Sequence, residues 1–389
     1  MANYQFHNPV HIHFGAGSLA LLGPLAAAYG SRCLLVTTSN DEAPLRPLYD
    51  RVKMILFNSG LTVAHFDEVV PNPTIQSVEK AIALARRVGA QVVVAVGGGS
   101  SIDAAKAVAL FHQKDGVDWH DAFSRFDSPF AAYPPVSAPA LPIIAVPTTA
   151  GTGSEMTQAM ILSDPATDEK ACIFHSDAFP AHAVIDSELT LSMPARLTAI
   201  TGFDAFCHAF ESRMRAEASP YTLALAQLAI EDITDALPRL LSDPHSIELR
   251  EKMSQAAMFA GISLSNAAAT VPHPLSEIIG GIAPRIAHGQ ALACLYPAYI
   301  RFQVRKTPEK CAQVARLMDA SLKQENNQTA VERLPELVSG FIGRIGLDKT
   351  LTQLGVTDGE KEKMLSHFLL GVLPFGTKEE LTAILQEAF

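Results

Sequence analysis

The sequence lacks the marks of a membrane-spanning, secreted or nucleic-acid-binding protein. It contains no run of about 18 apolar residues, the length that a membrane helix needs. Its first residues, MANYQFHNPVHIHFGAG, have neither the charged nor the apolar region of a secretory signal, so we expect none. No stretch is densely basic, and the formal net charge is −10. Neither nucleic acid nor an acidic membrane surface is therefore expected as a partner.

Cysteine is also scarce. The five cysteines are scattered, odd in number and never arranged as C-x-x-C, which argues against a disulfide framework. We interpret them as reduced thiols of a cytoplasmic protein. Apolar residues, in contrast, make up 48% of the 389 residues, which is enough to bury the core of two domains or of one large one.

Short apolar runs alternate with helical patterns in the first half of the chain. Cys33–Thr38 and Gln91–Val96 are rich in β-formers and are typical of buried parallel strands. Between them, apolar residues recur at helical spacing over residues 75–88, with Thr74 as a suitable N-cap and Gly89 as a suitable end. This alternation predicts an α/β domain.

After Pro194 the pattern changes to helical periodicity with few strand candidates. We therefore predict the fold class α/β plus all-α. The α/β domain is expected over residues 1–187, and the helical domain over residues 188–389.

The first predicted strand carries two histidines. Residues 9–16, PVHIHFGA, alternate enough to place His11 and His13 on one face of a strand. A metal-binding pair is one interpretation. Partly exposed histidines on an ordinary strand are the interpretation that we favour.

Two glycine-rich segments follow predicted strands. Residues 97–101 (GGGSS) open a helix that carries Asp103 and Lys106. The N–H groups of such a turn and the positive end of the helix can cradle a phosphate. The segment is neither G-x-G-x-x-G nor a P-loop, so a tight strand–helix connection is the alternative. The second segment, PTTAGTGSEMT at 147–157, offers hydroxyl groups that suit phosphate or ribose contacts.

Asp204 and His208 stand four residues apart in GFDAFCHAFE, a spacing that places both on one face of a helix. His273 and His288 follow in VPHPLSE and IAHGQA. One carboxylate and three imidazoles would form an N3O1 site for a divalent ion such as Fe2+ or Zn2+. Taken alone, the first pair has a plainer interpretation, an ion pair within a helix.

These segments resemble the iron-dependent (group III) alcohol dehydrogenases. GGGSSIDAAK, PTTAGTGSEMT and GFDAFCHAFE occur in the order of that family, and the resemblance runs from Pro9 to about Pro297. It implies a Rossmann-type N-terminal dinucleotide-binding domain, a helical C-terminal metal-binding domain and a homodimer or larger homo-oligomer. It also implies Fe2+ or Zn2+ together with NAD(H) or NADP(H).

The resemblance assigns roles to individual residues. The implied metal ligands are Asp204, His208, His273 and His288. The implied cofactor-binding residues are Thr38 and Asn72; Gly98, Gly99, Ser100 and Asp103 at the pyrophosphate and nicotinamide end; Thr148, Thr149 and Thr152 along the cofactor; and Lys170 near the nicotinamide ribose.

The chain departs from the family pattern at the third ligand. His273 and His288 lie 15 positions apart, one more than is common in the family. Many members carry a further histidine a few residues after the third ligand, where this chain has Ser276 or Glu277. A histidine proton relay is therefore in doubt. If the alignment is shifted, His273 corresponds to that further histidine instead, although the metal site would then lack one ligand.

The implied reaction is hydride transfer between C4 of nicotinamide and the carbonyl carbon of a small aldehyde, or the reverse from its alcohol. Four protein ligands leave no vacancy on a tetrahedral ion, which suits Fe2+ better than Zn2+. The segment 36–40 (VTTSN) has no carboxylate where many NAD-preferring members have Asp. We therefore lean slightly toward NADP(H) or dual use.

Other interpretations stay open at this point. Arg285, between two predicted ligands, could pair with an anionic substrate tail, or it could be an ordinary surface arginine. A dehydroquinate-synthase-like lyase that uses NAD and a metal is an alternative function. It would need more basic residues than residues 191–300 contain near the candidate ligands. A nucleotide-binding relative without catalysis is the third interpretation.

Overall fold

The fold is described from a computed structural model that covers residues 3–41, 44–136 and 139–389. The chain forms two compact units, His7–Met193 and Pro194–Phe389, the second of which also includes the chain up to Phe6. The first unit is α/β and the second is helical, as the sequence predicted. The units divide after Met193, whereas the sequence placed the domain boundary after residue 187; the domain limits stay a prediction.

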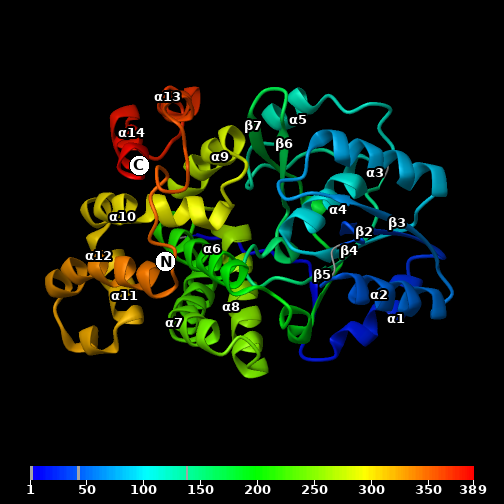
Figure 1. Cartoon of the computed structure of the whole chain (residues 1–389), viewed down its shortest axis with the longest axis horizontal. Coiled ribbons are helices and arrows are strands. Elements are labelled where there is room, and N and C mark those ends of the chain that lie inside the picture. Colours follow the sequence, from blue (N-terminus) through cyan, green and yellow to red (C-terminus); the bar gives the residue numbers. More distant parts are fainter. Residues whose placement is uncertain (1–2, 42–43, 137–138) are drawn as a thin grey trace. The chain divides into compact units, whose positions relative to one another are not determined.

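The α/β unit is built on a six-stranded sheet in which all neighbouring strands are parallel (Figure 1). The strand order is β1-β8-β5-β4-β2-β3, and β6 and β7 form a separate antiparallel hairpin. The strands are β1 (His11–Phe14), β2 (Arg32–Thr38), β3 (Thr62–Val69), β4 (Val92–Gly97), β5 (Ile143–Pro147), β6 (Ala159–Asp164), β7 (Glu169–Phe174) and β8 (His182–Ile185).

Helices cover both faces of this sheet. One apolar core joins the strands to α1 (Leu22–Ala27) and α2 (Arg46–Asn58), and a second core joins the opposite face to α3 (Ile75–Val88), α4 (Gly99–Phe111) and α5 (Trp119–Arg125). Burial on both faces explains why β4, β5 and the middle of β2, Cys33–Val36, are apolar. Helix α3 has the predicted limits: the Thr74 side chain accepts the N–H of Ser77, and Gly89 ends the helix in the left-handed conformation.

The strand order reverses direction between β2 and β4. From β2 the chain runs outward to β3, and then returns to the other side of β2 for β4, β5 and β8. Ligands of open α/β sheets bind at the carboxyl ends of the strands at such a switch point. Here the strands that flank it end at Thr38 and Gly97.

The helical unit is organised around α6, which packs against α7, α8 and α10. Every residue of α6 from Thr198 to Met214 is buried. No helix of the described ranges combines the length and apolar character that would let it cross a membrane. The helices are α6 (Ala195–Met214), α7 (Pro220–Ser242), α8 (Ile247–Ala267), α9 (Pro272–Ile282), α10 (His288–Lys306), α11 (Pro308–Met318), α12 (Asn327–Arg344), α13 (Asp358–Leu365) and α14 (Lys378–Glu387).

Candidate metal centre and nucleotide-binding loops

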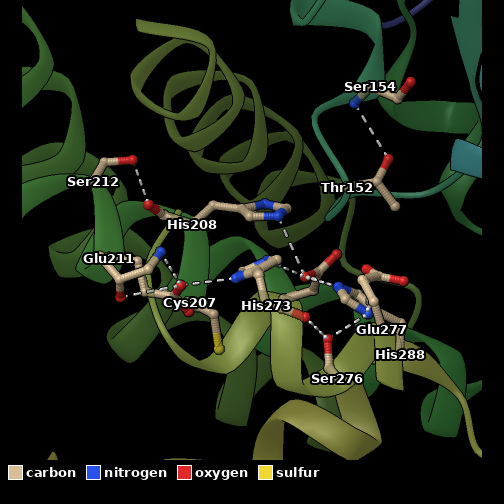
Figure 2. A network of polar contacts seen from close by, with 12 residues as sticks. Thr152, Ser154, Cys207, His208, Glu211, Ser212, His273, Ser276, Glu277 and His288 are labelled. Carbon is tan, nitrogen blue, oxygen red and sulfur yellow. Dashed lines mark hydrogen bonds and ion pairs between the residues drawn. The ribbon is translucent and has the colours of Figure 1, made fainter. Parts of the chain in front are cut away.

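Three helices of the second unit bring the four predicted ligands together. Asp204 and His208 lie one turn apart within α6, as their spacing predicted. His273 is in the first turn of α9, and His288 is the first residue of α10. Figure 2 shows the rings of the three histidines turned toward one another. The structure thus brings His273 together with the other three residues.

The three imidazoles converge on one carboxylate oxygen. The Nε2 atoms of His208, His273 and His288 lie 3.5, 3.7 and 3.5 Å from Oδ1 of Asp204. Donor atoms of Asp204, His273 and His288 all lie within 4.8 Å of one another. The ring of His208 stacks on that of His273, with 4.7 Å between the ring centroids.

Two of these converging atoms are buried without a hydrogen-bond partner among the described residues: Oδ1 of Asp204 and Nε2 of His273. The three distances from Oδ1 of Asp204 are longer than a hydrogen bond. They are close to the edge of about 3.4 Å expected for a tetrahedron of ligands at about 2.1 Å from an ion. The donor set and its spacing thus fit one divalent transition-metal ion.

His273 is held by a carboxylate behind it. Its Nδ1 donates a hydrogen bond of 2.9 Å to Oε2 of Glu211, which also accepts the N–H of Thr270. The other oxygen of Glu211 accepts the hydroxyl of Tyr296 at 3.2 Å. With its Nδ1 proton donated to Glu211, the ring would present Nε2 to a metal ion beside Asp204, the arrangement typical of metal-binding histidines. Glu211 was not among the predicted site residues, although its position three residues after His208 puts it on the same helix face.

His288 is oriented in the same manner by α9. The hydroxyl of Ser276 donates to the carbonyl of His273 at 2.7 Å and therefore accepts from Nδ1 of His288, 3.1 Å away. Oε1 of Glu277 lies 3.5 Å from the same nitrogen. Ser276 and Glu277, the positions where many family members carry a further histidine, thus both stand beside a candidate ligand.

The protonation states follow from burial and neighbouring charge. Burial lowers the pKa of His208 to about 4, which keeps this imidazole neutral near pH 7. Burial also opposes the charged form of His273, but the carboxylates of Glu211 and Asp204 outweigh it and raise the pKa to about 10. For Asp204, the histidines outweigh the effect of burial and hold the pKa far below its usual range. Near pH 7 the carboxylates of Asp204 and Glu211 thus hold a charged His273 between them, and a metal ion bound there would replace the proton on Nε2 of this ring.

A glycine allows α10 to approach α6 closely enough for His288 to reach Asp204. A Cβ atom at Gly289 would lie 2.2 Å from the carbonyl oxygen of Ile200 in α6. That distance is possible only for glycine, because the obstacle is backbone rather than a mobile side chain. The glycine after His288 in IAHGQA therefore has a packing role in the metal centre.

In the other unit, the two glycine-rich segments lie against each other. Gly98 caps α4, so strand, glycine turn and helix follow as predicted. A Cβ atom at Gly98 would contact the side chain of Thr149 at 3.3 Å, and one at Gly99 would meet Thr152 at 2.8 Å. The N–H of Thr148 donates to the carbonyl of Gly97. The glycine turn, which Ser100 follows in the first turn of α4, thus packs against the threonine-rich loop. Together they form one surface at the ends of β4 and β5.

Lys106 and Asp103 of α4 hold these two segments together through buried hydrogen bonds. The ammonium of Lys106, fully buried, donates to the hydroxyls of Ser154 and Thr157, at 2.9 and 3.1 Å. The carboxylate of Asp103 accepts from the hydroxyl of Ser154 and from the N–H of Ile161. Both oxygens of Asp103 thus accept hydrogen bonds inside the unit, and its contact with the cofactor stays a prediction.

The remaining predicted cofactor residues surround the same strand ends. Asn72 has a positive φ of 56° and precedes Thr74, which bridges to Ser163 of β6. Lys170 of β7 is the register partner of Ser163. The hairpin thus joins the Asn72 and Lys170 segments. Thr38 ends β2, where its hydroxyl lies 2.7 Å from that of Tyr49.

Arg285 is engaged elsewhere. Its guanidinium makes two contacts with the carboxylate of Glu360, at 2.6 and 2.7 Å, and donates to the carbonyl of Gly355 at 2.7 Å. This bidentate pair links the loop before α10 to the N-terminus of α13. The hypothesis that Arg285 binds an anionic substrate tail is not supported, and the arginine has a surface structural role.

Comparison with known families agrees with this geometry. A family model described as iron-containing alcohol dehydrogenase matches residues 9–187. A second, described as the C-terminal part of the Fe-containing alcohol dehydrogenase family, matches residues 198–389. The chain belongs to the iron-containing alcohol dehydrogenase family. The resemblance inferred from the motifs is thereby confirmed.

Relatives match this alcohol dehydrogenase over most of their length. The 1,3-propanediol dehydrogenase of Klebsiella pneumoniae is 31% identical over 382 residues, which cover 97% of this chain and 96% of the relative. The NADPH-dependent butanol dehydrogenase of Clostridium saccharobutylicum is 32% identical over 356 residues, 92% and 88% of the two chains. The crystal structure of an archaeal halo-thermophilic alcohol dehydrogenase from a Red Sea brine pool has a TM-score of 0.90 at 30% identity, covering 100% of both chains.

Membership in this family confirms the predicted enzyme class. The family consists of NAD(P)-dependent oxidoreductases that act on alcohols or aldehydes, and the predicted hydride transfer is confirmed at that level. The lyase and the non-catalytic nucleotide-binding relative, which the sequence alone had left open, are set aside.

Proposed function

We propose that Asp204, His208, His273 and His288 hold one Fe2+ ion, with Zn2+ as the alternative. The observation that carries this proposal is the convergence of three Nε2 atoms on Oδ1 of Asp204, with buried polar atoms that no described residue satisfies. Four protein ligands favour an ion that accepts a fifth ligand readily, which is why we prefer iron. Bound there, the ion would polarise a substrate carbonyl and lower the pKa of an alcohol hydroxyl.

We further propose that the dinucleotide binds at the switch point of the sheet. The turn with Gly98, Gly99 and Ser100 would hold the pyrophosphate through backbone N–H groups and the N-terminus of α4. The residues proposed to line the rest of the cofactor are Thr38, Asn72, Thr148, Thr149, Thr152 and Lys170. Asp103 would act indirectly, by fixing the loop that carries Thr152.

The choice between NAD(H) and NADP(H) depends on the end of β2. A cavity of about 470 Å3 opens there, lined among others by Ser39, Lys80, Asp67 and Glu68. Lys80 is paired with Glu68 at 2.8 Å. A carboxylate at this place can bind the ribose 2′-hydroxyl, whereas a lysine attracts a 2′-phosphate. We propose dual use with a slight preference for NADP(H), because residues 38–40 carry no negative charge.

The proposed substrate is a short aliphatic alcohol or its aldehyde, by analogy with the relatives named for 1,3-propanediol and butanol. In the direction of reduction, a hydride leaves C4 of the dihydronicotinamide for the carbonyl carbon, and a proton reaches the oxygen. The roles of the chain are to hold both reactants and to keep His208 neutral and able to bind metal.

Metal removal and one matched pair of variants test this function. Chelator treatment should abolish NADPH- and NADH-dependent reduction of short aldehydes, and added Fe2+ should restore it. Asp204→Asn should lower kcat/KM more than about 100-fold, since even partners behind metal ligands cost 10–100-fold. The exposed Asp358→Asn is the control and should retain full activity. Full activity of the chelated protein, or of Asp204→Asn, would refute the proposed centre.

We also propose that the protein is a cytoplasmic homodimer or larger homo-oligomer. All five cysteines are free thiols in the structure, which agrees with a reducing compartment. The oligomeric state is supported by the resemblance to the family alone. Light scattering of the purified protein tests it, and a mass near 41.6 kDa, that of one chain, would contradict it.

A further inference from the structure

Three histidines gather at the edge of the parallel sheet in the α/β unit, and none of them is a residue of the candidate metal centre. His11 and His13 alternate along β1, the outermost strand, and His182 begins the neighbouring strand β8. His11 and His182 are direct partners in the register. Parallel partners point to the same side of a sheet, and so do residues two apart on one strand. All three imidazoles therefore share one face.

The rings are already close. Nε2 of His13 lies 3.1 Å from Nδ1 of His182, and the ring centroids of His11 and His182 are 5.3 Å apart. The other nitrogen of His182 lies 3.0 Å from the hydroxyl of Tyr29. If His182 donates to Tyr29, the lone pair of its Nδ1 faces His13, which is the tautomer arrangement found behind metal-binding histidines.

We propose that His11, His13 and His182 form a second metal site, which binds a divalent ion of the zinc, nickel or copper type. Nε2 of His13 and Nδ1 of His182 share a hydrogen bond in the structure, and a bound ion would replace the shared proton and use both nitrogens as ligands. His11 is exposed and completes the site by turning its ring about its side-chain bonds. Water fills the remaining position.

The chemistry of this site differs from that of the Asp204 centre. It offers imidazole nitrogen alone and no carboxylate, and such sets favour copper, nickel and zinc. A bound ion would cross-link β1 to β8 and hold the edge strand in place.

Counting metal ions tests the site directly. The untagged full-length protein, freed of metal by chelator and desalted, is titrated with Zn2+ against a chromogenic chelator. The wild type should bind two equivalents per chain, and His13→Gln should bind one. His120→Gln and His245→Gln change exposed histidines outside the cluster and should still bind two. A wild type that binds a single equivalent, or a His13→Gln protein that binds two, would overturn the proposal.

A spectroscopic measurement identifies the ligands. Cu2+ bound to a protein carrying Asp204→Asn and His208→Asn, in which the other centre is disabled, should show nitrogen hyperfine splitting in its electron paramagnetic resonance spectrum. In the same background, His11→Gln or His182→Gln should change the splitting to the pattern of one fewer coordinating nitrogen. Splitting that persists unchanged in both would refute these ligands. His13→Gln should retain wild-type aldehyde reduction, because none of the three histidines belongs to the proposed catalytic groups.

Discussion

Glu211 accepts a hydrogen bond from Nδ1 of His273 while Nε2 of the same ring faces Asp204. One carboxylate thereby fixes the tautomer and the orientation of an imidazole whose working nitrogen is on the opposite side. Glu211 is itself held by Thr270 and Tyr296. The metal centre thus extends at least one layer beyond the four proposed ligands.

Glu211→Gln should weaken metal binding. The amide keeps the size of the side chain but removes the negative charge that raises the pKa of His273. We expect the affinity for Fe2+ or Zn2+ to fall about 10- to 100-fold, as for other partners behind metal ligands. Competition with a chelator of known affinity measures it. Glu248→Gln, an exposed carboxylate on α8, is the matched control, and equal affinity of both variants would contradict the proposed role.

Gly289→Ala should destabilise the helical unit and loosen its hold on metal. The new methyl group would collide with the carbonyl of Ile200, so α10 must shift and carry His288 with it. We expect a loss of about 1–3 kcal/mol in the free energy of unfolding, as is typical of overpacking. Gly343→Ala in α12 meets open space and should gain up to about 1 kcal/mol. Chemical denaturation measures the free energy of unfolding of both variants. An unchanged free energy for Gly289→Ala would refute the close approach of α10 to α6.

Ser39→Asp should turn the cofactor preference toward NADH. A carboxylate at this position would repel the 2′-phosphate of NADPH and could bind the 2′-hydroxyl of NADH. The ratio of kcat/KM for NADPH to that for NADH should fall at least about tenfold, equivalent to about 1.4 kcal/mol. Ser39→Ala should leave the ratio near the wild-type value. An unchanged ratio in Ser39→Asp would show that the adenosine ribose lies elsewhere.

Glu155→Gln should change how stability depends on pH. Burial raises the pKa of Glu155 from 4.5 to about 7, so between these values the folded protein holds a proton that the unfolded chain has lost. Stability of the wild type must therefore fall as the pH rises through this window. Across this window, the free energy of unfolding of the wild type should fall by on the order of 2 kcal/mol more than that of Glu155→Gln.

The single tryptophan allows the stability of the α/β unit to be measured by fluorescence. Trp119 is buried in the α/β unit, to which Glu155 also belongs, so its fluorescence follows the unfolding of that unit. Urea unfolding at pH 5, 6 and 7 should give a steeper decline for the wild type than for Glu155→Gln. The exposed Glu188→Gln should keep the wild-type slope. Parallel curves for all three proteins would contradict the burial argument.

Local signals in the sequence predicted most of the scaffold. The cap at Thr74 and the glycine at 89 gave the limits of α3, and the spacing of Asp204 and His208 placed both on one helix face. The meeting of that pair with His273 and His288 depends on how α9 and α10 pack against α6. Spacing alone could not predict this meeting, and it was inferred from family resemblance.

Contacts distant in sequence account for what the sequence alone did not predict. Asp103 is buried where Ser154 and Ile161 donate to its carboxylate, and neither contact follows from the residues near position 103. The histidines of β1 meet His182 only because the first and last strands of the unit are neighbours in the sheet. Glu211 was within reach of helical periodicity, but its partner Tyr296 comes from α10.

The enclosure of α6 on every side has a consequence for engineering this enzyme. A substitution anywhere from Thr198 to Met214 disturbs packed neighbours, so random mutagenesis should return few folded proteins altered in that stretch. Laboratory evolution toward new alcohols will find its tolerated changes in other segments, while this helix stays nearly invariant among the survivors.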